Sequence, residues 1–141
     1  MTGPAPDTGK EPLWFERRVG LRWNDADELG HVNHTLYLAY MAESRYRLGG
    51  DALGLTGMKE FVTVRIEVDY LAELYVSAEW VTARSRLLHV GTSSIRTLDE
   101  IVRPDGVVAA RAEAVSVMTD RTTARSRPLT AHERSILESL L

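Results

Sequence analysis

The chain has 141 residues, a length typical of one domain, and its 44% hydrophobic and 26% charged residues are ordinary for a soluble globular protein. Its formal net charge of −3 provides no global positive field that would favour nucleic acid or an anionic membrane as a partner. It contains no cysteine, which excludes disulfides, thiol nucleophiles and cysteine-ligated zinc, and which fits a cytoplasmic location.

Residues 1–12, MTGPAPDTGKEP, contain three prolines, two glycines and no large apolar residue after Met1. This composition predicts a disordered tail that precedes a single domain over residues 13–141. The segment lacks the basic start and apolar run of a secretory signal. No apolar stretch is long enough to span a bilayer, so we expect no membrane partner.

The first predicted elements are a strand and a long helix. Apolar residues on odd positions from Phe15 to Trp23 predict a strand with one buried face. We expect Trp23, like Trp80, to lie in the core. From Thr35 onward the apolar spacing becomes helical, which predicts an amphipathic helix from Thr35 to Leu48 that Gly49-Gly50 ends.

The rest of the chain reads mostly as strands. Residues 61–70 alternate, with Val62, Val64, Ile66, Val68 and Tyr70 on one face. Further strands are predicted at residues 76–88, 94–104 and 107–120, with a Pro-Asp-Gly turn at residues 104–106. Thr130 and Glu133 have capping-box spacing, which predicts a short C-terminal helix. This order predicts an α+β fold in which an antiparallel sheet of about five strands covers one long helix.

Chemistry-bearing residues gather between the first strand and the helix, in NDADELGHVNHTLYLAY. Asp25, Asp27, His31 and His34 lie there around Gly30. The sequence has no G-x-S-x-G elbow, P-loop or G-x-G-x-x-G motif, so neither a serine nucleophile of that kind nor nucleotide binding is supported. We therefore expect no cofactor.

Three interpretations of this loop remain open. His31 and His34 with the two aspartates could bind a metal, but no third histidine lies close in sequence. Alternatively, Asp27 is a general base or nucleophile, and backbone N–H groups near Asn33 and His34 polarise a carbonyl at the helix N-terminus. In the third interpretation, the aspartates and Asn33 only cap a turn and the helix, and both histidines are solvated.

The stretch RWNDADELGHVNHTLYLAYMAESR resembles the D-x-D-x-x-G-H-V-N-N motif and aromatic helix of hotdog-fold acyl-CoA thioesterases in the hydroxybenzoyl-CoA thioesterase-like family. The matching positions are Trp23, Asp25, Asp27, Gly30, His31, Val32, Asn33, Tyr37, Tyr40, Glu43 and Arg45. Weaker matches in VRIEVDYLAEL and in residues 91–120 extend the resemblance over most of the chain. It implies a hotdog fold, in which the sheet wraps around one long central helix.

The resemblance also implies an activity and an assembly. The family hydrolyses acyl-CoA, and its catalytic carboxylate falls on Asp27, with Asn33 and the amide near His34 at the helix start. It implies a homodimer or a dimer of dimers with the substrate at the subunit interface. The substrate-binding residues it implies are Gly30, His31, Tyr37, Val64, Arg65, Thr92, Ser93 and Ser94. From the net charge of −3 and the weak spacing of His31 and His34, we expect no nucleic-acid partner and no bound metal.

The sequence departs from the family pattern at three places. His34 replaces the usual second asparagine, and Glu43 and Arg45 do not keep the E-x-x-R spacing. The basic cluster that some members carry before the fourth strand is missing. Arg86 is the nearest cation there, so Thr92, Ser93 and Ser94 are expected to take part of its role towards the CoA phosphates.

Several alternatives accompany this interpretation. Glu43 is a second candidate for the catalytic carboxylate, against a salt bridge or a charge on the helix surface. A basic tract of Arg121, Arg125 and Arg127 is a solvated loop by default and a CoA-phosphate contact otherwise. At the level of the whole protein, the rivals are a hotdog hydratase or dehydratase and a non-catalytic module that binds acyl-CoA or an acyl carrier.

Overall fold

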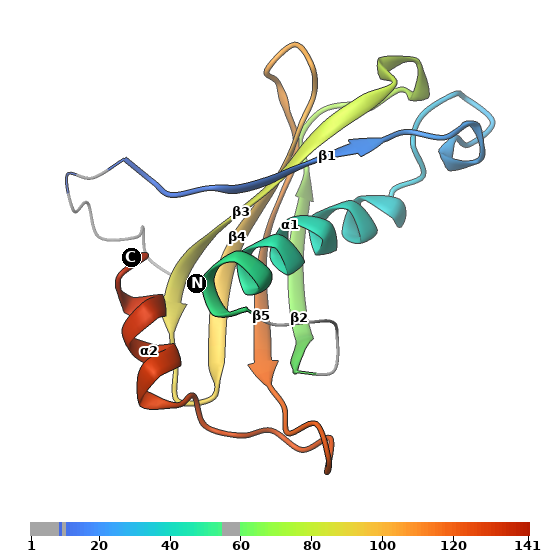
Figure 1. Ribbon diagram of the computed structural model, residues 1–141. Coiled ribbons are helices and arrows are strands. Elements are labelled where there is room, and N and C mark those ends of the chain that lie inside the picture. Colours follow the sequence, from blue (N-terminus) through green and yellow to red (C-terminus); the bar gives the residue numbers. More distant parts are fainter. Residues whose placement is uncertain (1–8, 10, 55–59) are drawn as a thin grey trace.

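The computed structural model describes residue 9, residues 11–54 and residues 60–141. It consists of a five-stranded antiparallel sheet with one long helix across its face (Figure 1). The strands are β1 (Phe15–Gly20), β2 (Phe61–Tyr70), β3 (Trp80–Val90), β4 (Ser94–Val102) and β5 (Val108–Met118), and the helices are α1 (Leu36–Leu53) and α2 (Ala131–Glu138). The strand order is β1-β3-β4-β5-β2, which confirms the predicted α+β class. Most of the predicted disordered tail lies outside the described residues, as does part of the predicted connection after α1.

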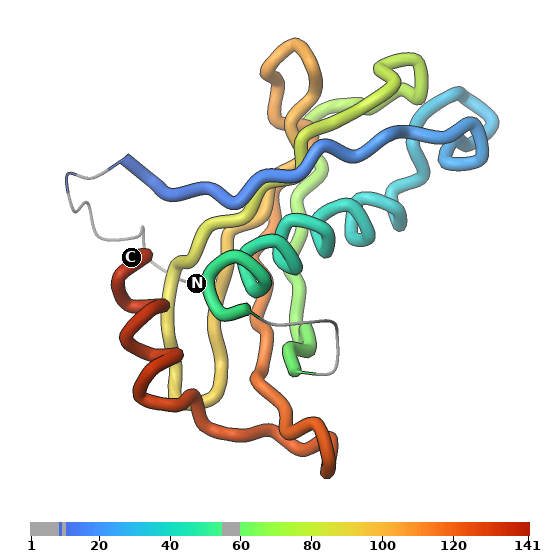
Figure 2. The backbone as a smooth tube through the Cα atoms, viewed as in Figure 1, coloured from blue at the N-terminus to red at the C-terminus, as the bar shows by residue number. Residues whose placement is uncertain are grey.

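The main core lies between α1 and the sheet. Tyr37, Tyr40 and Met41 of α1 pack in one buried cluster with Ala110 and Ala112 of β5. Because alanine leaves space above the strand, the bulky helix residues can fill it at interior packing density. In the view of Figure 2, β1 runs above α1, and this helix contacts β1 as well as β3 and β4.

The helix is longer than the sequence pattern predicted. It continues through Gly49 and Gly50 to Leu53, and it ends at Gly54, whose φ of 66° is left-handed. Each internal glycine costs roughly 1 kcal/mol relative to alanine. That cost is offset because Leu48 is fully buried and Leu53 packs against the second core cluster, around Phe61 and Leu137.

Strand β2 does not keep the predicted alternation. Its register against β5 shifts between Thr63 and Arg65. Phe61 therefore packs inward before the shift, and Ile66 and Val68 pack inward after it. Val62 and Val64 are 42% and 60% exposed on this edge strand, so they do not share one face with the inward-packed Ile66 and Val68, as the alternation had predicted.

Trp23 is also not a core residue. Strand β1 ends at Gly20, and Trp23 begins a 3₁₀ turn over Trp23–Asp25, where its side chain is 87% exposed. Trp80 is half-buried beneath the Arg18 guanidinium, 3.7 Å from the ring centroid. The alternation from Phe15 continued past the end of the strand by coincidence.

A pair of opposite charges lies inside the core. The Arg45 guanidinium on α1 donates to the Asp99 carboxylate on β4, and both side chains are almost completely inaccessible to water. The Ser85 hydroxyl donates to the same carboxylate at 2.7 Å and shares a further hydrogen bond with Ser44 at 2.7 Å. This polar chain links the middle of α1 to β3 and β4.

The later strands and α2 follow the sequence closely. The strand predicted from residue 76 begins at Trp80, after a 3₁₀ turn over Val76–Ala78. At the start of α2 the predicted capping box is confirmed. The Thr130 hydroxyl accepts the Glu133 N–H at 3.1 Å, and the Glu133 carboxylate accepts the Thr130 N–H at 2.9 Å.

Candidate active site

The loop between β1 and α1 folds back on itself like a small hairpin. Ala26 and Val32 form an antiparallel bridge. The Asp27 N–H donates to the His31 carbonyl at 2.7 Å, and the Asn33 N–H donates to the Asp25 carbonyl at 2.8 Å. Gly30 closes the turn with a φ of 79°, a conformation that glycine adopts without strain. The loop is thus held by its own backbone and brings Asp27 opposite His31.

Asp25 is the buried anchor of this loop. Its carboxylate accepts the Tyr40 hydroxyl at 2.7 Å and the Arg22 N–H at 3.1 Å. Burial raises the pKa of Asp25, but the hydrogen bonds from Tyr40 and Arg22 and the Arg22 charge together lower it below its usual value. The same burial and hydrogen bond raise the pKa of Tyr40. Asp25 therefore stays ionised and joins the loop to α1.

Asp27 is exposed, and only one of its two carboxylate oxygens accepts hydrogen bonds from the described residues. Its Oδ1 accepts the Leu29 N–H at 2.9 Å and the His31 N–H at 3.1 Å. Its Oδ2 accepts no hydrogen bond within the part of the chain that the structure describes. The carboxylate is thus fixed in orientation by one oxygen, while the other remains available to a proton or a substrate atom.

The start of α1 offers a backbone donor. The Asn33 side-chain oxygen accepts the Thr35 N–H at 3.0 Å and the Thr35 hydroxyl at 2.8 Å, so Asn33 holds the turn that leads into Thr35, the N-cap of the helix. Among the described residues, no acceptor takes the His34 N–H. The His34 carbonyl accepts the Tyr70 hydroxyl at 2.8 Å, which ties the entrance to β2. An unpaired N–H at a helix N-terminus can bind developing negative charge.

Two residues that the sequence reasoning missed lie beside His31. They are Glu73 and Tyr75, from the connection between β2 and β3. The Tyr75 ring meets the His31 ring edge-on at 4.6 Å between centroids, and its hydroxyl donates to Glu73 at 2.6 Å. Glu73 Oε1 lies 3.9 Å from His31 Nε2. No spacing pattern could have found them, since they approach only through the tertiary fold.

Other predicted substrate-binding residues do not gather around Asp27 in one chain. Tyr37 is buried in the core, and burial, with the Tyr70 and Glu73 charges, raises its pKa. Arg65 pairs with Glu67 on the exposed face of β2. The preceding residue, Val64, lies roughly 20 Å along the strand from Tyr70, at about 3.3 Å per residue.

The predicted turn of Thr92, Ser93 and Ser94 lies at the other end of the molecule. The Thr92 carbonyl accepts the Leu129 N–H at 2.9 Å, and the Ser93 carbonyl accepts the Met118 N–H at 2.9 Å. In Figure 1 this β3–β4 turn is at the bottom beside α2, whereas the loop after β1 is at the right-hand end of α1. A single chain therefore does not unite Thr92–Ser94 with Asp27.

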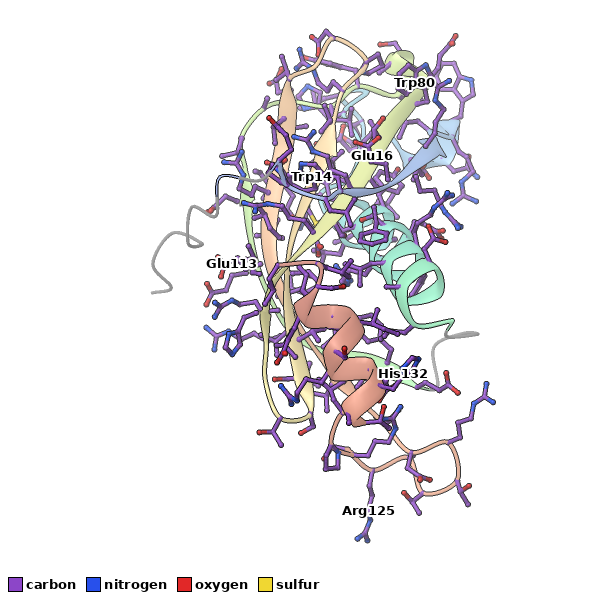
Figure 3. All side chains as sticks on the ribbon, turned by 60° about the vertical axis from the view of Figure 1, so that its left-hand side comes forward. Trp14, Glu16, Trp80, Glu113, Arg125 and His132 are labelled. Atoms are coloured by element: carbon purple, nitrogen blue, oxygen red, sulfur yellow. The ribbon has the colours of Figure 1, made fainter. Side chains whose placement is uncertain are left out.

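Three of the four charged alternatives, Glu43, Arg121 and Arg127, pair with a side chain of opposite charge. Glu43 pairs with Arg17 at 3.2 Å, and Arg127 makes a two-fold pair with Glu133 at 2.7 and 3.0 Å. Arg121 pairs with Glu60. Figure 3 shows Arg125 pointing away from the body of the molecule.

Two absences hold for the part of the chain that the structure describes. No group of three or more histidine, cysteine, aspartate or glutamate side chains is placed to hold a metal ion. No helix there is long and apolar enough to cross a membrane.

Residues 21–137 match the family model of the thioesterase-like superfamily. The chain belongs to this superfamily. The matched residues include the loop after β1, helix α1 and strands β2 to β5. They therefore include every part of the candidate site. No curated protein matches the chain.

Solved structures of similar proteins agree with this superfamily and establish the hotdog fold. A predicted thioesterase from Bacillus stearothermophilus superposes with a TM-score of 0.81 at 25% identity, over 92% of this chain and 97% of its own. A thioesterase from Thermus thermophilus, complexed with coenzyme A and Zn, is 30% identical with a TM-score of 0.71, over 89% and 92%. A thioesterase-superfamily protein from Jannaschia sp. CCS1, at 21% identity, shares the fold with a TM-score of 0.81 over 99% and 97%.

Proposed function

We propose that this chain hydrolyses an acyl-CoA thioester to the free acid and CoA, with Asp27 as the catalytic carboxylate. The proposal rests on two groups of the loop. The Asp27 carboxylate is held through Oδ1, while Oδ2 accepts no hydrogen bond from the described residues, and the His34 N–H at the start of α1 has no acceptor among them. The thioesterase-like superfamily supports the reaction class. The CoA-bound relative from Thermus thermophilus supports CoA as the carrier of the acyl group.

The reaction uses few protein groups. Asp27 Oδ2 takes a proton from a water molecule, whose oxygen attacks the thioester carbonyl carbon; alternatively, Oδ2 attacks that carbon itself and water then hydrolyses the anhydride. In either route the carbonyl oxygen becomes an oxyanion, which accepts the His34 N–H. The C–S bond breaks as the oxyanion collapses, and CoA leaves as a thiolate, which takes up the proton held by Asp27 or, in the anhydride route, a proton of the hydrolytic water. Asn33 holds the helix entrance in position, and Gly30 and His31 form the adjacent wall.

The proposal includes a homodimer, or a dimer of such dimers. Strand β2 is an edge strand, and its exposed Val62 and Val64 give it an apolar rim. Edge strands of this kind are normally paired or covered. A partner subunit paired on β2 would cover Val64 and Arg65. In the dimer of dimers, a further subunit would supply Thr92, Ser93 and Ser94 to a site that one chain cannot assemble. The cysteine-free sequence supports a cytoplasmic location as part of this proposal.

A substitution pair tests the catalytic assignment. Asp27→Asn keeps the size and the acceptor oxygen but removes the charge, so kcat for the best acyl-CoA should fall by about 10²–10⁴-fold with KM little changed. Asp25→Asn is the matched control from the same loop. The Asp25→Asn variant should have a clearly lower melting temperature, because Asp25 anchors Tyr40 and the Arg22 backbone. The kcat of its folded fraction should change little.

The measurement is thiol release from a panel of acyl-CoA thioesters, with crotonyl-CoA hydration followed separately. Near wild-type hydrolysis by the Asp27→Asn variant would refute the assignment and make Glu43 the leading carboxylate. Hydration without hydrolysis would indicate a hydratase, and binding without either reaction would indicate a binding module.

A further inference from the structure

Tyr70 has no role in the catalytic proposal, although it contacts the start of α1. It is the last residue of β2, paired with Ala110 in the sheet, and it lies 36 residues beyond His34 in the chain. Its hydroxyl donates to the His34 carbonyl at 2.8 Å. Its ring meets the His34 ring edge-on at 6.0 Å between centroids and lies against the Tyr37 ring at 5.1 Å. The end of β2 is therefore tied to the residue whose N–H is the proposed oxyanion donor.

The His34 carbonyl belongs to a peptide unit that is held at both ends. A peptide unit is planar and joins the carbonyl of one residue to the N–H of the next, here His34 and Thr35. Its oxygen accepts the Tyr70 hydroxyl, and its N–H donates to the Asn33 side-chain oxygen at 3.0 Å. Two contacts from different parts of the fold thus fix the plane of this unit.

The preceding peptide unit carries the free donor. It joins the Asn33 carbonyl to the His34 N–H, and its oxygen accepts the Leu36 N–H at 3.0 Å. The two units meet at the His34 Cα, where only the backbone dihedrals φ and ψ turn one plane against the other. Because both planes are held, the direction of the His34 N–H is held as well. Without Tyr70, the unit of His34 and Thr35 is fixed by Asn33 alone.

The Tyr70 contact matters more for geometry than for stability. Tyr70 is 45% exposed, so its hydroxyl can bond to water when the His34 carbonyl is not its partner. Exchange of a protein partner for water changes the free energy of unfolding only modestly. Oxyanion stabilisation is more demanding, because the donor must point at the place where negative charge develops before the reaction begins. A small turn of the His34 N–H therefore lowers the rate more than it lowers stability.

We propose that Tyr70 is a positioning residue for thioester hydrolysis, which directs the His34 N–H at the developing oxyanion by holding the His34 carbonyl. This inference rests on the proposed function and adds a residue to its site. Tyr70 transfers no proton in this role and acts only through the backbone of His34. Asn33 ties the shared peptide unit to the loop, and Tyr70 ties the same unit to the sheet.

The first test compares Tyr70→Phe and Asn33→Ala in hydrolysis of the best acyl-CoA. Loss of a whole oxyanion donor lowers kcat by about 10²–10³-fold, so a donor that remains but is less well directed should lower kcat by roughly 10–100-fold. Both variants should show this fall with KM little changed, because the donor acts on the transition state. The control is Tyr46→Phe, which removes a hydroxyl roughly 15 Å along α1 from Leu36 and should keep the wild-type kcat.

A stable mimic of the oxyanion separates positioning from a structural role. The mimic is a CoA thioether with a trifluoromethyl ketone in place of the thioester carbonyl, and this ketone adds hydroxide or a carboxylate to give a tetrahedral alkoxide. Its affinity should fall in Tyr70→Phe by the same factor as kcat/KM. The affinity for a plain CoA thioether and the melting temperature should stay close to the wild-type values. A lower melting temperature with an equal loss of affinity for both ligands would overturn the proposal.

The positioning role and the proposed function fail in different ways. If the wild type is active and Tyr70→Phe keeps its kcat, the positioning role is wrong and the assignment of Asp27 is untouched. If the wild type hydrolyses no thioester but its affinity for the trifluoromethyl ketone depends on Tyr70, the proposed function fails and the directed His34 N–H stands. If it neither hydrolyses a thioester nor distinguishes the ketone from the plain thioether, both fail.

Discussion

Replacing Asp99 by leucine should strongly destabilise the protein, although the side chain makes no contact with solvent or with the candidate site. The change leaves the Arg45 guanidinium buried between α1 and the sheet without its carboxylate. Removing one partner of a buried ion pair typically costs about 3–5 kcal/mol. For a domain of this size that corresponds to a fall in melting temperature of roughly 10–15 °C.

The structure also indicates what should rescue this variant. Burial raises the pKa of Asp99 above its usual value, in spite of the lowering by Arg45 and by the Ser85 hydroxyl. The removal of this carboxylate from water therefore works against its pairing with Arg45. Buried pairs of this kind can often be replaced by apolar residues at no net cost. The double variant Arg45→Met/Asp99→Leu should thus unfold within about 1 kcal/mol of the wild type.

Denaturant unfolding of the wild type, both single variants and the double variant forms a closed cycle that measures the coupling. Asp51→Asn is the control, since it breaks the exposed Arg47–Asp51 pair on the same helix and should cost less than about 1 kcal/mol. A cost of less than about 1 kcal/mol for each single change would contradict a strongly coupled buried pair. A double variant whose loss of unfolding free energy equals the sum of the two single losses would contradict it as well.

Three further outcomes follow from the site and its surroundings. His34→Pro removes the free N–H and should abolish hydrolysis in folded protein, whereas His34→Ala should retain substantial kcat; equal losses would implicate the imidazole. Light scattering at micromolar concentration should give at least a dimer, and Val64→Lys should dissociate it and inactivate the enzyme; a stable, active monomer contradicts the β2 interface. The Arg127 pair, opposed by burial and helped by the Thr130 N–H, lowers the pKa of Glu133 from 4.5 to about 2. Stability from this carboxylate is therefore complete above pH 4.5 and lost as pH falls towards 2, and acid unfolding of Glu133→Gln should lack that loss.

Local signals predicted the elements whose stability is local. The Pro-Asp-Gly turn between β4 and β5 is confirmed, with Gly106 at a φ of 87° and the Arg103 N–H on the Val107 carbonyl. The capping box of α2 is confirmed for the same reason, because its partners are three residues apart. The loop after β1 was also recognisable, since its turn and its polar groups belong to one short segment.

Tertiary packing decided the features that the sequence did not reveal. The helix continues past Gly49 because burial of Leu48 and Leu53 outweighs glycine's local preference. No local pattern distinguishes Arg45, which binds a carboxylate on a distant strand, from an ordinary charged helix residue. Glu73 reaches His31 in the same way, through the fold alone. The roles of Asp27, Asn33 and His34 in catalysis remain predictions.

The exposed position of Trp23 makes the loop its own optical reporter. The other two tryptophans lie against guanidinium groups, Trp14 at 4.3 Å from Arg84 and Trp80 at 3.7 Å from Arg18, whereas the Trp23 indole is 87% in water. Indole emission moves to shorter wavelength when water is excluded from the ring. The long-wavelength part of the fluorescence therefore belongs mainly to Trp23, and any molecule that covers the Asp27 loop will shift it to the blue without an added label.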